Sequence, residues 1–216
     1  MLKKDTTYHA DTLADISHQL KTPLTSMMVM SDLLRNNTVP EKQKEFIGIM
    51  ENQLDKMKWL ITNLLKLSKL DTGTADYKKE DFSVYSALNQ SINLFIITMD
   101  IKEITFVNEA KNFTVRGDED RTAEAFGNII NNCIEHTQKG GRLEIHTQTT
   151  TIFNSVIIKD NGCGIAKEDL PHIFQRFYDG KNVSSDSVCI GLALDKTIFE
   201  KESATIEVKS EEGKGT

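Results

Sequence analysis

Two long stretches of helical periodicity open the chain. Between about Asp11 and Leu34 apolar residues recur at steps of three or four, which is the spacing of one helix face. They are Leu13, Ile16, Leu20, Leu24, Met27, Met30 and Leu34. Polar residues and a proline interrupt the pattern over 36–40, and Pro40 suits the first turn of a second amphipathic helix that extends to Leu67. The pattern predicts a helical hairpin.

Each predicted helix has an apolar stripe wider than one partner helix can cover. Two hairpins that pack together as a four-helix bundle bury these stripes most economically, so we expect a homodimer. The turn-forming residues Asp71-Thr72-Gly73-Thr74 end the second helix. We therefore expect one domain over residues 1–72 and a second over residues 73–216.

The second domain shows shorter elements of both kinds. We expect helices at Ser83–Ile97, Asp120–His136 and Leu192–Glu200, and strands at Ile104–Val107, Leu143–Gln148, Ser155–Asp160 and Thr205–Lys209. Strands that pair beside one another, with helices in separate runs, predict an α/β sandwich with helices on one face of a mixed sheet. The expected fold class is thus a helical hairpin followed by an α/β sandwich.

Composition narrows the class of protein. With 216 residues, 38% hydrophobic and 27% charged, the chain has ordinary globular make-up. A net charge of −6 does not favour binding to a nucleic-acid backbone, and we expect no nucleic-acid partner. Three cysteines without a CxxC pair argue against a disulfide framework and a structural zinc site. The apolar runs are too short to cross a bilayer, so we expect a cytoplasmic chain. Such a chain is also compatible with the cytoplasmic portion of a membrane-anchored sensor.

The octapeptide Ser17-His18-Gln19-Leu20-Lys21-Thr22-Pro23-Leu24 places a histidine at the exposed edge of the first helix. A proline inside a helix costs about 3 kcal/mol, and a bend next to His18 is one reason to have it. A neutral imidazole nitrogen facing solvent is a competent nucleophile at pH 7. On these residues alone, however, a solvated helix histidine beside a tolerated kink is the preferred interpretation.

Four polar residues occur at steps of four in the predicted helix 120–136: Glu124, Asn128, Asn132 and His136. Asparagine has poor helix propensity, and carboxamide oxygens are suitable ligands for Mg²⁺, which usually accompanies phosphates. An amphipathic helix whose polar face is simply solvated explains the same residues, and taken alone that interpretation is slightly favoured.

Two glycine-containing segments follow. Asp160-Asn161-Gly162-Cys163-Gly164-Ile165 comes directly after an apolar strand, where its glycines permit positive φ and its carboxylate can accept a hydrogen bond from an exocyclic amine. Ile190-Gly191-Leu192-Ala193-Leu194 leads into a helix whose free N–H groups can hold phosphate. A plain turn and a plain helix start explain each segment equally well when it is taken alone.

The order of the motifs is more specific than any one of them. SHQLKTPL, NIINN, DNGCGI, FQRF, IGLAL and the final GKGT succeed one another over essentially the whole chain. This set resembles the sensor histidine kinases of two-component systems. The resemblance implies a dimerisation and histidine-phosphotransfer hairpin, followed by a Bergerat-fold (GHKL) ATP-binding domain.

The resemblance implies a role for each matching residue. His18 would be the phosphoacceptor with Gln19 beside it, and Thr22 would position water for dephosphorylation of the partner. Asn128 and Asn132 would be metal ligands, with Asn132 the more direct. The implied ATP-binding set is Asn128, Asn132, His136, Asp160, Gly162, Gly164, Ile165, Phe177, Lys181, Gly191, Leu192 and Thr216.

The implied activity is ATP-dependent autophosphorylation on His18, followed by transfer of the phosphoryl group to an aspartate of a response-regulator receiver domain. ATP and Mg²⁺ would be the cofactors, and the enzyme would act as a homodimer. The family generally has a further strand after the position of Thr216, so we expect a shortened ATP-binding domain.

Several residues depart from the family pattern. Gln19 stands where an acidic residue usually acts as base, and Glu135 stands where a phosphate-contacting lysine is common. Ser187 and Cys189 replace usual glycines. These departures favour an alternative, a degenerate, phosphatase-biased or nucleotide-binding pseudokinase regulator. A helical adaptor without any nucleotide site is a third interpretation.

Overall fold

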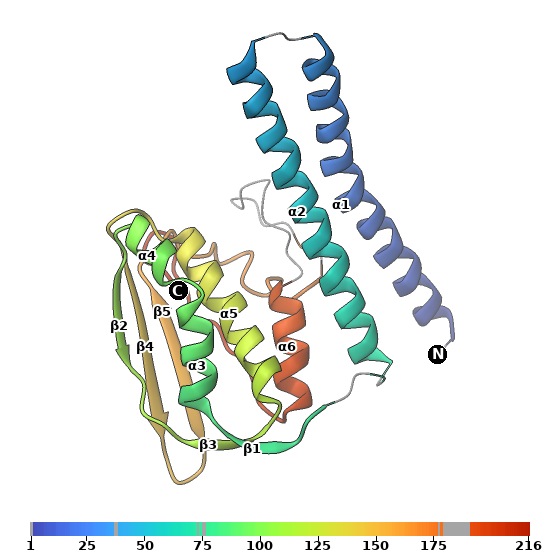
Figure 1. The fold of residues 1–216 in the computed structure, drawn as a ribbon. Helices are drawn as coiled ribbons and strands as arrows, with labels where there is room; N and C mark the ends of the chain where they lie inside the picture. Colours follow the sequence, from blue (N-terminus) through green and yellow to red (C-terminus); the bar gives the residue numbers. More distant parts are fainter. Residues whose placement is uncertain (1, 37–38, 73, 75–76, 177, 179–190) are drawn as a thin grey trace. The chain divides into compact units, whose positions relative to one another are not determined.

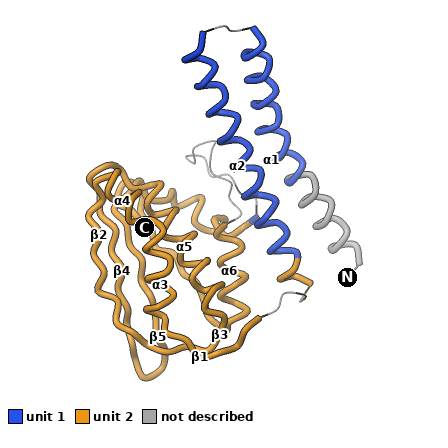
Figure 2. Tube along the Cα trace, in the orientation of Figure 1, with its two compact units in different colours: residues 1–68, 176–190 blue, residues 69–175, 191–216 orange. Residues whose placement is uncertain are grey.

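The computed structural model describes residues 2–36, 39–72, 74, 77–176, 178 and 191–216, with side chains from Ile16 onward. The chain forms two compact units, one of residues 1–68 and 176–190 and one of residues 69–175 and 191–216 (Figure 2). None of the helices in the described ranges is long and apolar enough to span a membrane. The expected domain boundary after residue 72 stays a prediction.

The helical hairpin is confirmed. Helix α1 spans Leu2–Asn36 and α2 spans Pro40–Asp71 (Figure 1). Pro23 lies inside α1 and is buried. Its ring removes the backbone donor that the carbonyl of Gln19 would otherwise use, so the helix has a weakened turn directly after His18.

The hairpin leaves many large apolar side chains exposed. On α2, Ile47, Leu54, Ile61 and Leu65 are each 44–59% exposed, and the first three recur at intervals of seven residues. On α1, Leu24, Met28, Val29 and Leu33 are also exposed. An apolar series at heptad spacing is typical of a helix that packs against further helices.

The second unit contains two sheets. Strand β1 (Glu80–Ser83) pairs antiparallel with β3 (Thr114–Gly117). The larger sheet has the order β2-β4-β5, in which β2 (Thr105–Glu109) is parallel to β4 (Arg142–Thr149) and β5 (Asn154–Asp160) is antiparallel to β4. The sheet is therefore mixed, as the sequence predicted.

Four helices complete this unit: α3 (Val84–Asn93), α4 (Ile96–Ile101), α5 (Glu119–His136) and α6 (Gly191–Lys201). Helices α3, α5 and α6 lie on the same face of the β2-β4-β5 sheet (Figure 1). This arrangement confirms the predicted α/β sandwich.

Helix α5 supplies the centre of the core. The buried cluster comprises Phe82, Val84, Ala87, Leu88, Ile92, Met99, Ile104, Ala123, Phe126, Ile130, Cys133, Ile134, Leu143 and Ile145. Ile130 on α5 and Leu143 and Ile145 on β4 are completely buried, and burial of each such side chain contributes about 1.5–3 kcal/mol. The apolar face of α5 is thus held firmly against the sheet.

The helix predicted at Ser83–Ile97 is wrong in its extent. Ser83 is the N-cap of α3, and its hydroxyl accepts a hydrogen bond from the Ser86 N–H, so the helix begins at Val84. The chain then turns at Leu94 and Phe95 before α4. Phe95 packs against the core after this turn, a tertiary contact that the apolar run itself does not reveal.

The strand predicted at Thr205–Lys209 is also wrong. Ile206 and Val208 are half-buried and alternate with exposed neighbours, so the period of two is present. Within the described ranges, however, these residues lie in no strand ladder. The strands β1 and β3, each of four residues, were not predicted because so short a segment carries no clear alternation.

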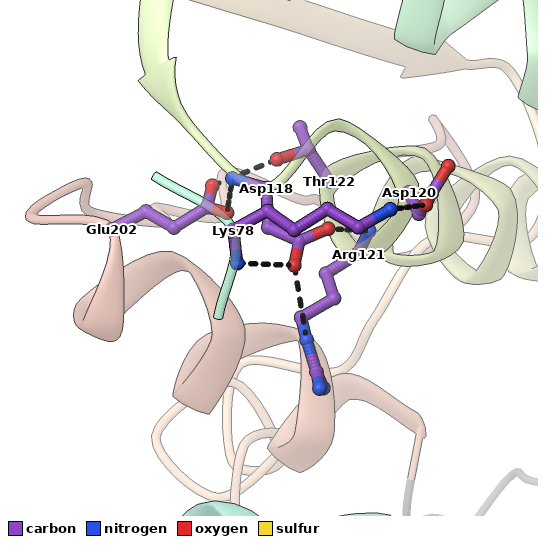
Figure 3. Close-up of polar contacts among 6 residues, drawn as sticks. All are labelled: Lys78, Asp118, Asp120, Arg121, Thr122 and Glu202. Atoms are coloured by element: carbon purple, nitrogen blue, oxygen red, sulfur yellow. Dashed lines mark hydrogen bonds and ion pairs between the residues drawn. The ribbon is translucent and has the colours of Figure 1, made fainter. Parts of the chain in front are cut away.

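A polar cluster anchors the N-terminus of α5 (Figure 3). Asp118 is the N-cap of this helix. The Glu202 carboxylate, just after α6, accepts hydrogen bonds from the Asp118 N–H at 2.9 Å and the Thr122 hydroxyl at 2.7 Å. The Lys78 N–H donates to the Asp118 carboxylate at 3.1 Å. The start of α5 is therefore tied to the end of α6 and to the segment that enters the unit.

A lysine caps the other end of α5. Lys102 Nζ lies 2.7 Å from the carbonyl oxygen of Ile134, 3.1 Å from that of Glu135 and 3.4 Å from that of Thr137. A cation at a helix C-terminus satisfies carbonyls that have no partner within the helix and interacts favourably with the helix dipole.

We expect Lys102→Met to lower the free energy of unfolding by about 1–2 kcal/mol, because it leaves these carbonyls without their charged donor while keeping most of the side-chain volume. Urea denaturation followed by circular dichroism measures the change. Lys111→Met, at an exposed position, is the matched control and should be nearly neutral. Equal stabilities of the two variants would contradict the capping role.

Candidate functional site

The polar face of α5 contacts α6 through one hydrogen bond. Asn128 Nδ2 donates to Asp195 Oδ1 at 2.8 Å. Asp195 is completely buried, and its other oxygen, Oδ2, has no hydrogen-bond partner in the described part of the chain. Burial raises the pKa of the Asp195 carboxyl well above its usual range, while the hydrogen bond from Asn128 opposes this shift.

The next two residues on this face have different environments. Asn132 is half-buried and its side chain forms no hydrogen bond within the described ranges, so its carboxamide is available to a ligand. His136 is exposed at the end of α5. Glu135 is exposed as well, and its carboxylate accepts a hydrogen bond from the Asn131 Nδ2 at 2.9 Å.

The loop after β5 begins with a buried carboxylate. Asp160 is only 5% exposed, and its Oδ1 accepts a hydrogen bond from the Gly162 N–H at 2.8 Å. The Cys133 thiol of α5 lies against the same carboxylate. Burial and the nearby Asp160 charge raise the pKa of this thiol, so Cys133 stays protonated and can donate to Asp160.

The two glycines of this loop allow close backbone packing. A Cβ on Gly162 would lie 2.5 Å from the carbonyl oxygen of His136. Gly164 has φ +66°, and a Cβ there would collide with the carbonyl oxygen of Glu211. Both glycines are therefore required for the loop to fit between the end of α5 and the C-terminal segment.

The C-terminal segment lies alongside the loop. Ser210 Oγ accepts from the Ile165 N–H at 2.8 Å, donates to the Gly215 carbonyl oxygen at 2.8 Å and lies 2.9 Å from the Thr216 hydroxyl. The Asp160 N–H donates to the Thr216 carbonyl oxygen at 2.9 Å. These contacts bring Ile165 and Thr216, both predicted site residues, to the same place as Asp160.

Helix α6 begins beside this group. Gly191 is buried at its first position and Leu192 is half-buried. Asp195, one turn later, carries the contact to Asn128. The structure thus brings together the α5 face, the loop after β5, the C-terminal segment and the start of α6. Phe177, Lys181, Ser187 and Cys189 lie outside the described residues.

The first unit carries the remaining predicted residues. His18 and Thr22 are exposed on α1 and Gln19 is half-buried. The Thr22 hydroxyl donates to the His18 carbonyl oxygen at 3.3 Å, which places the two side chains one turn apart on the same side of the helix. Both also line an open surface groove along α1.

Sequence reasoning missed three residues of this arrangement. Asp195 gave one usable signal, since an acidic residue directly after Leu192, Ala193 and Leu194 stands within an apolar run of the helix. Ser210 and the buried Cys133 gave none, because their importance arises from contacts with segments distant in sequence.

Two family models match the chain. Residues 9–73 match the His Kinase A (phospho-acceptor) domain. Residues 117–216 match the family described as histidine kinase-, DNA gyrase B- and HSP90-like ATPase. The two matches cover α1 from residue 9 onward, all of α2 and the whole candidate site of the second unit.

Curated relatives agree with these models. The chain is 32% identical over 215 residues to the sensor protein kinase WalK of Staphylococcus epidermidis, an alignment covering 94% of this chain and 35% of that protein. A WalK sequence of Staphylococcus aureus is 31% identical over 94% of this chain and 51% of its own length. The chain therefore spans about a third to a half of the length of the curated relatives it matches.

Solved structures share the fold. The Acinetobacter baumannii histidine kinase AdeS has a TM-score of 0.71 at 22% identity, with 92% of this chain and 93% of that chain covered. The histidine kinase ThkA, solved in complex with the response regulator protein TrrA, has a TM-score of 0.77 at 21% identity, with 94% and 57% covered.

The glycine packing of the site loop is open to test. We expect Gly164→Ala to destabilise the protein more than Gly213→Ala. Both glycines have positive φ, at +66° and +78°, but a Cβ on Gly213 meets no atom within 4 Å. Backbone strain should cost about 1–2 kcal/mol at either position, and the collision at Gly164 should add roughly 1–3 kcal/mol.

Chemical denaturation of the two alanine variants measures the difference. Equal losses of stability would mean that strain alone acts at both positions and that the loop does not pack closely on the C-terminal segment.

Proposed function

Since the chain belongs to the sensor histidine kinases, with their phosphoacceptor and ATPase domains, we propose that it is the core of an ATP-dependent protein-histidine kinase acting in a two-component system. The phosphoryl group of ATP is transferred to His18 and then to an aspartate of a response regulator. The relatives named as sensor kinases favour this function over the pseudokinase alternative.

The observation that carries the proposal is the exposed His18 on α1 in a chain that also holds the ATPase domain. An exposed imidazole can reach a substrate, and Thr22 lies one turn further on the same side of the helix. Solvent access at His18 is what a phosphoacceptor requires.

The residues of the second unit fit Mg²⁺-ATP. The donor set consists of carboxamide oxygens on α5 and the carboxylate of Asp160, which suit a hard cation and an exocyclic amine respectively. Asn132 and Asn128 would hold Mg²⁺, with Asn132 the more direct ligand, and Asp160 would read adenine. The free N–H groups at the start of α6, near Gly191 and Leu192, would hold phosphate. When bound, Mg²⁺ would neutralise the negative charge of the ATP phosphates.

The reaction at His18 balances as a simple displacement. A neutral ring nitrogen attacks the γ-phosphorus, a nitrogen–phosphorus bond forms, and the bond to the bridging oxygen breaks with departure of ADP. Gln19 can hold the N–H of the other ring nitrogen by a hydrogen bond but cannot accept its proton, so this proton leaves to solvent once the nitrogen–phosphorus bond has formed. The receiver aspartate then takes the phosphoryl group, and His18 returns to its free form.

Two partners belong to the proposal. A second copy of the chain covers the exposed apolar series Ile47, Leu54 and Ile61 in a four-helix bundle. A response-regulator receiver domain docks on the hairpin beside His18. The complex of ThkA with TrrA supports this second partner by likeness of fold.

We expect His18→Ala to abolish phosphoryl label while ATP binding stays nearly intact, because His18 lies in one unit and Asn132 and Asp160 lie in the other. The protein is incubated with γ-labelled ATP and Mg²⁺, and the label is tested for lability in acid and stability in base. Titration calorimetry checks ATP binding. Label that persists on the variant would place the acceptor elsewhere, and absence of label on the wild type would favour the pseudokinase.

Substitution of Asn132 tests the nucleotide site. Asn132→Ala should weaken Mg²⁺-ATP binding roughly tenfold or more, the loss expected for a ligand to a charged group. Asn131→Ala is the matched control, because Asn131 bonds only to Glu135 and should change affinity by no more than about twofold. Calorimetric titration compares the two, and equal dissociation constants would mean that the site is misplaced. Asp160→Ala should behave as Asn132→Ala does.

The departure at position 19 generates a further expectation. Gln19→Glu supplies a proton acceptor beside His18, and general-base help is worth ~10²–10⁴ in rate where proton removal is limiting. If the neutral imidazole attacks directly, the gain should be modest. Single-turnover autophosphorylation of the wild type and the variant, at matched ATP saturation, measures the ratio. A clear fall in rate, with folding and ATP binding preserved, would contradict the role assigned to Gln19.

A further inference from the structure

We propose that Asp195 is a positioning residue for Mg²⁺ binding, which holds the Asn128 carboxamide so that its oxygen, and not its nitrogen, faces the cation. The inference rests on the proposed function, because it assigns the cation to the Asn128/Asn132 face of α5. It concerns a residue of α6 that lies outside every motif recognised in the sequence.

The contact between the two side chains is specific. Asn128 Nδ2 donates to Asp195 Oδ1 at 2.8 Å, which commits the nitrogen end of the carboxamide to α6. The oxygen end of Asn128 then lies on the opposite side of the amide group, away from Asp195. A carboxamide nitrogen carries hydrogens and does not bind Mg²⁺, whereas the oxygen does. The direction of this one hydrogen bond therefore decides whether Asn128 can be a ligand.

Asp195 is well suited to hold that direction. It is completely buried. The neighbouring residue Leu194 is completely buried as well, and Ala193 and Ile198 on the same helix are also buried. A fully enclosed side chain has little freedom to change rotamer, so the acceptor is presented in one place. Asp195 Oδ1 accepts this hydrogen bond, so the contact engages the amide nitrogen of Asn128 and not its oxygen.

Packing alone does not account for a carboxylate here. One of its two oxygens has no hydrogen-bond partner in the described part of the chain, and a buried oxygen of this kind is unfavourable for folding. Alanine has better helix propensity than aspartate. Asp195 is thus a poor choice for stability, and the hydrogen bond to Asn128 is the contact that distinguishes it from an apolar residue.

The test separates an effect on Mg²⁺ binding from an effect on nucleotide binding. The dissociation constant of ADP is measured by titration calorimetry with Mg²⁺ and with EDTA, and the ratio of the two gives the Mg²⁺ contribution. We expect Asp195→Ala to reduce this contribution about tenfold, as is usual when a residue that orients a metal ligand is removed. The EDTA constant should change by no more than about twofold, and the melting temperature should not fall by more than a few degrees.

Two further variants control for structure. Asp195→Asn keeps an acceptor oxygen on a side chain of the same size, so this variant should retain most of the Mg²⁺ contribution. It also keeps the test informative if the alanine variant folds poorly. In an Asn128→Ala background, Asp195→Ala should have no further effect on the Mg²⁺ contribution, because the two residues act through one contact.

The outcomes distinguish a failure of the proposed function from a failure of the positioning role of Asp195. Wild-type protein that binds neither ADP nor ATP would overturn the proposed function. Wild-type protein that binds them with a Mg²⁺ contribution unaffected by Asp195→Ala would overturn only the positioning role. Equal weakening of binding with Mg²⁺ and with EDTA would also overturn it, since that result indicates a general structural role.

Discussion

The packing of α5 against the β2-β4-β5 sheet is the constraint on which the rest of the second unit depends. Its apolar face, with Ile130 and Ile134 fully or almost fully buried, makes α5 the centre of the core. Because the helix cannot rotate without exposing these residues, Asn128, Asn132 and His136 are held on a fixed polar face. Core packing therefore positions the predicted ligands Asn128 and Asn132, although neither belongs to the core.

Three groups of contacts then fix the position of α5 along its axis. Glu202 and Lys78 bind Asp118 at its N-terminus, and Lys102 caps the carbonyls at its C-terminus (Figure 3). The Gly162 loop packs on the last turn of the helix. The glycines of this loop act mainly on backbone packing, and they hold the loop beside Asp160, the residue proposed to read adenine.

The division of the chain into two units has a chemical consequence. His18, Gln19 and Thr22 lie in one unit, and the predicted ligands Asn128, Asn132 and Asp160 lie in the other. Acceptor reactivity and nucleotide affinity can therefore be changed separately by substitution. Two of the departures from the family pattern lie in different units, since Gln19 lies beside His18 on α1 and Glu135 lies on α5. Glu135 is exposed and paired with Asn131, which leaves the Asn132 carboxamide unaffected.

The sequence by itself determined the parts whose information is local. The period of the apolar residues predicted both hairpin helices, α5, β4 and β5, and the order of the motifs predicted the family. The site residues that this order implies stay predictions. Tertiary structure decided what depends on contacts between distant segments. The turn at Leu94 and Phe95 arises from packing on the core, and the Thr205–Lys209 segment alternates like a strand but lies in no ladder. The contact between Asp195 and Asn128 exists only because α6 packs beside α5, and a hydrogen bond between residues 67 positions apart leaves no periodic signal in the sequence.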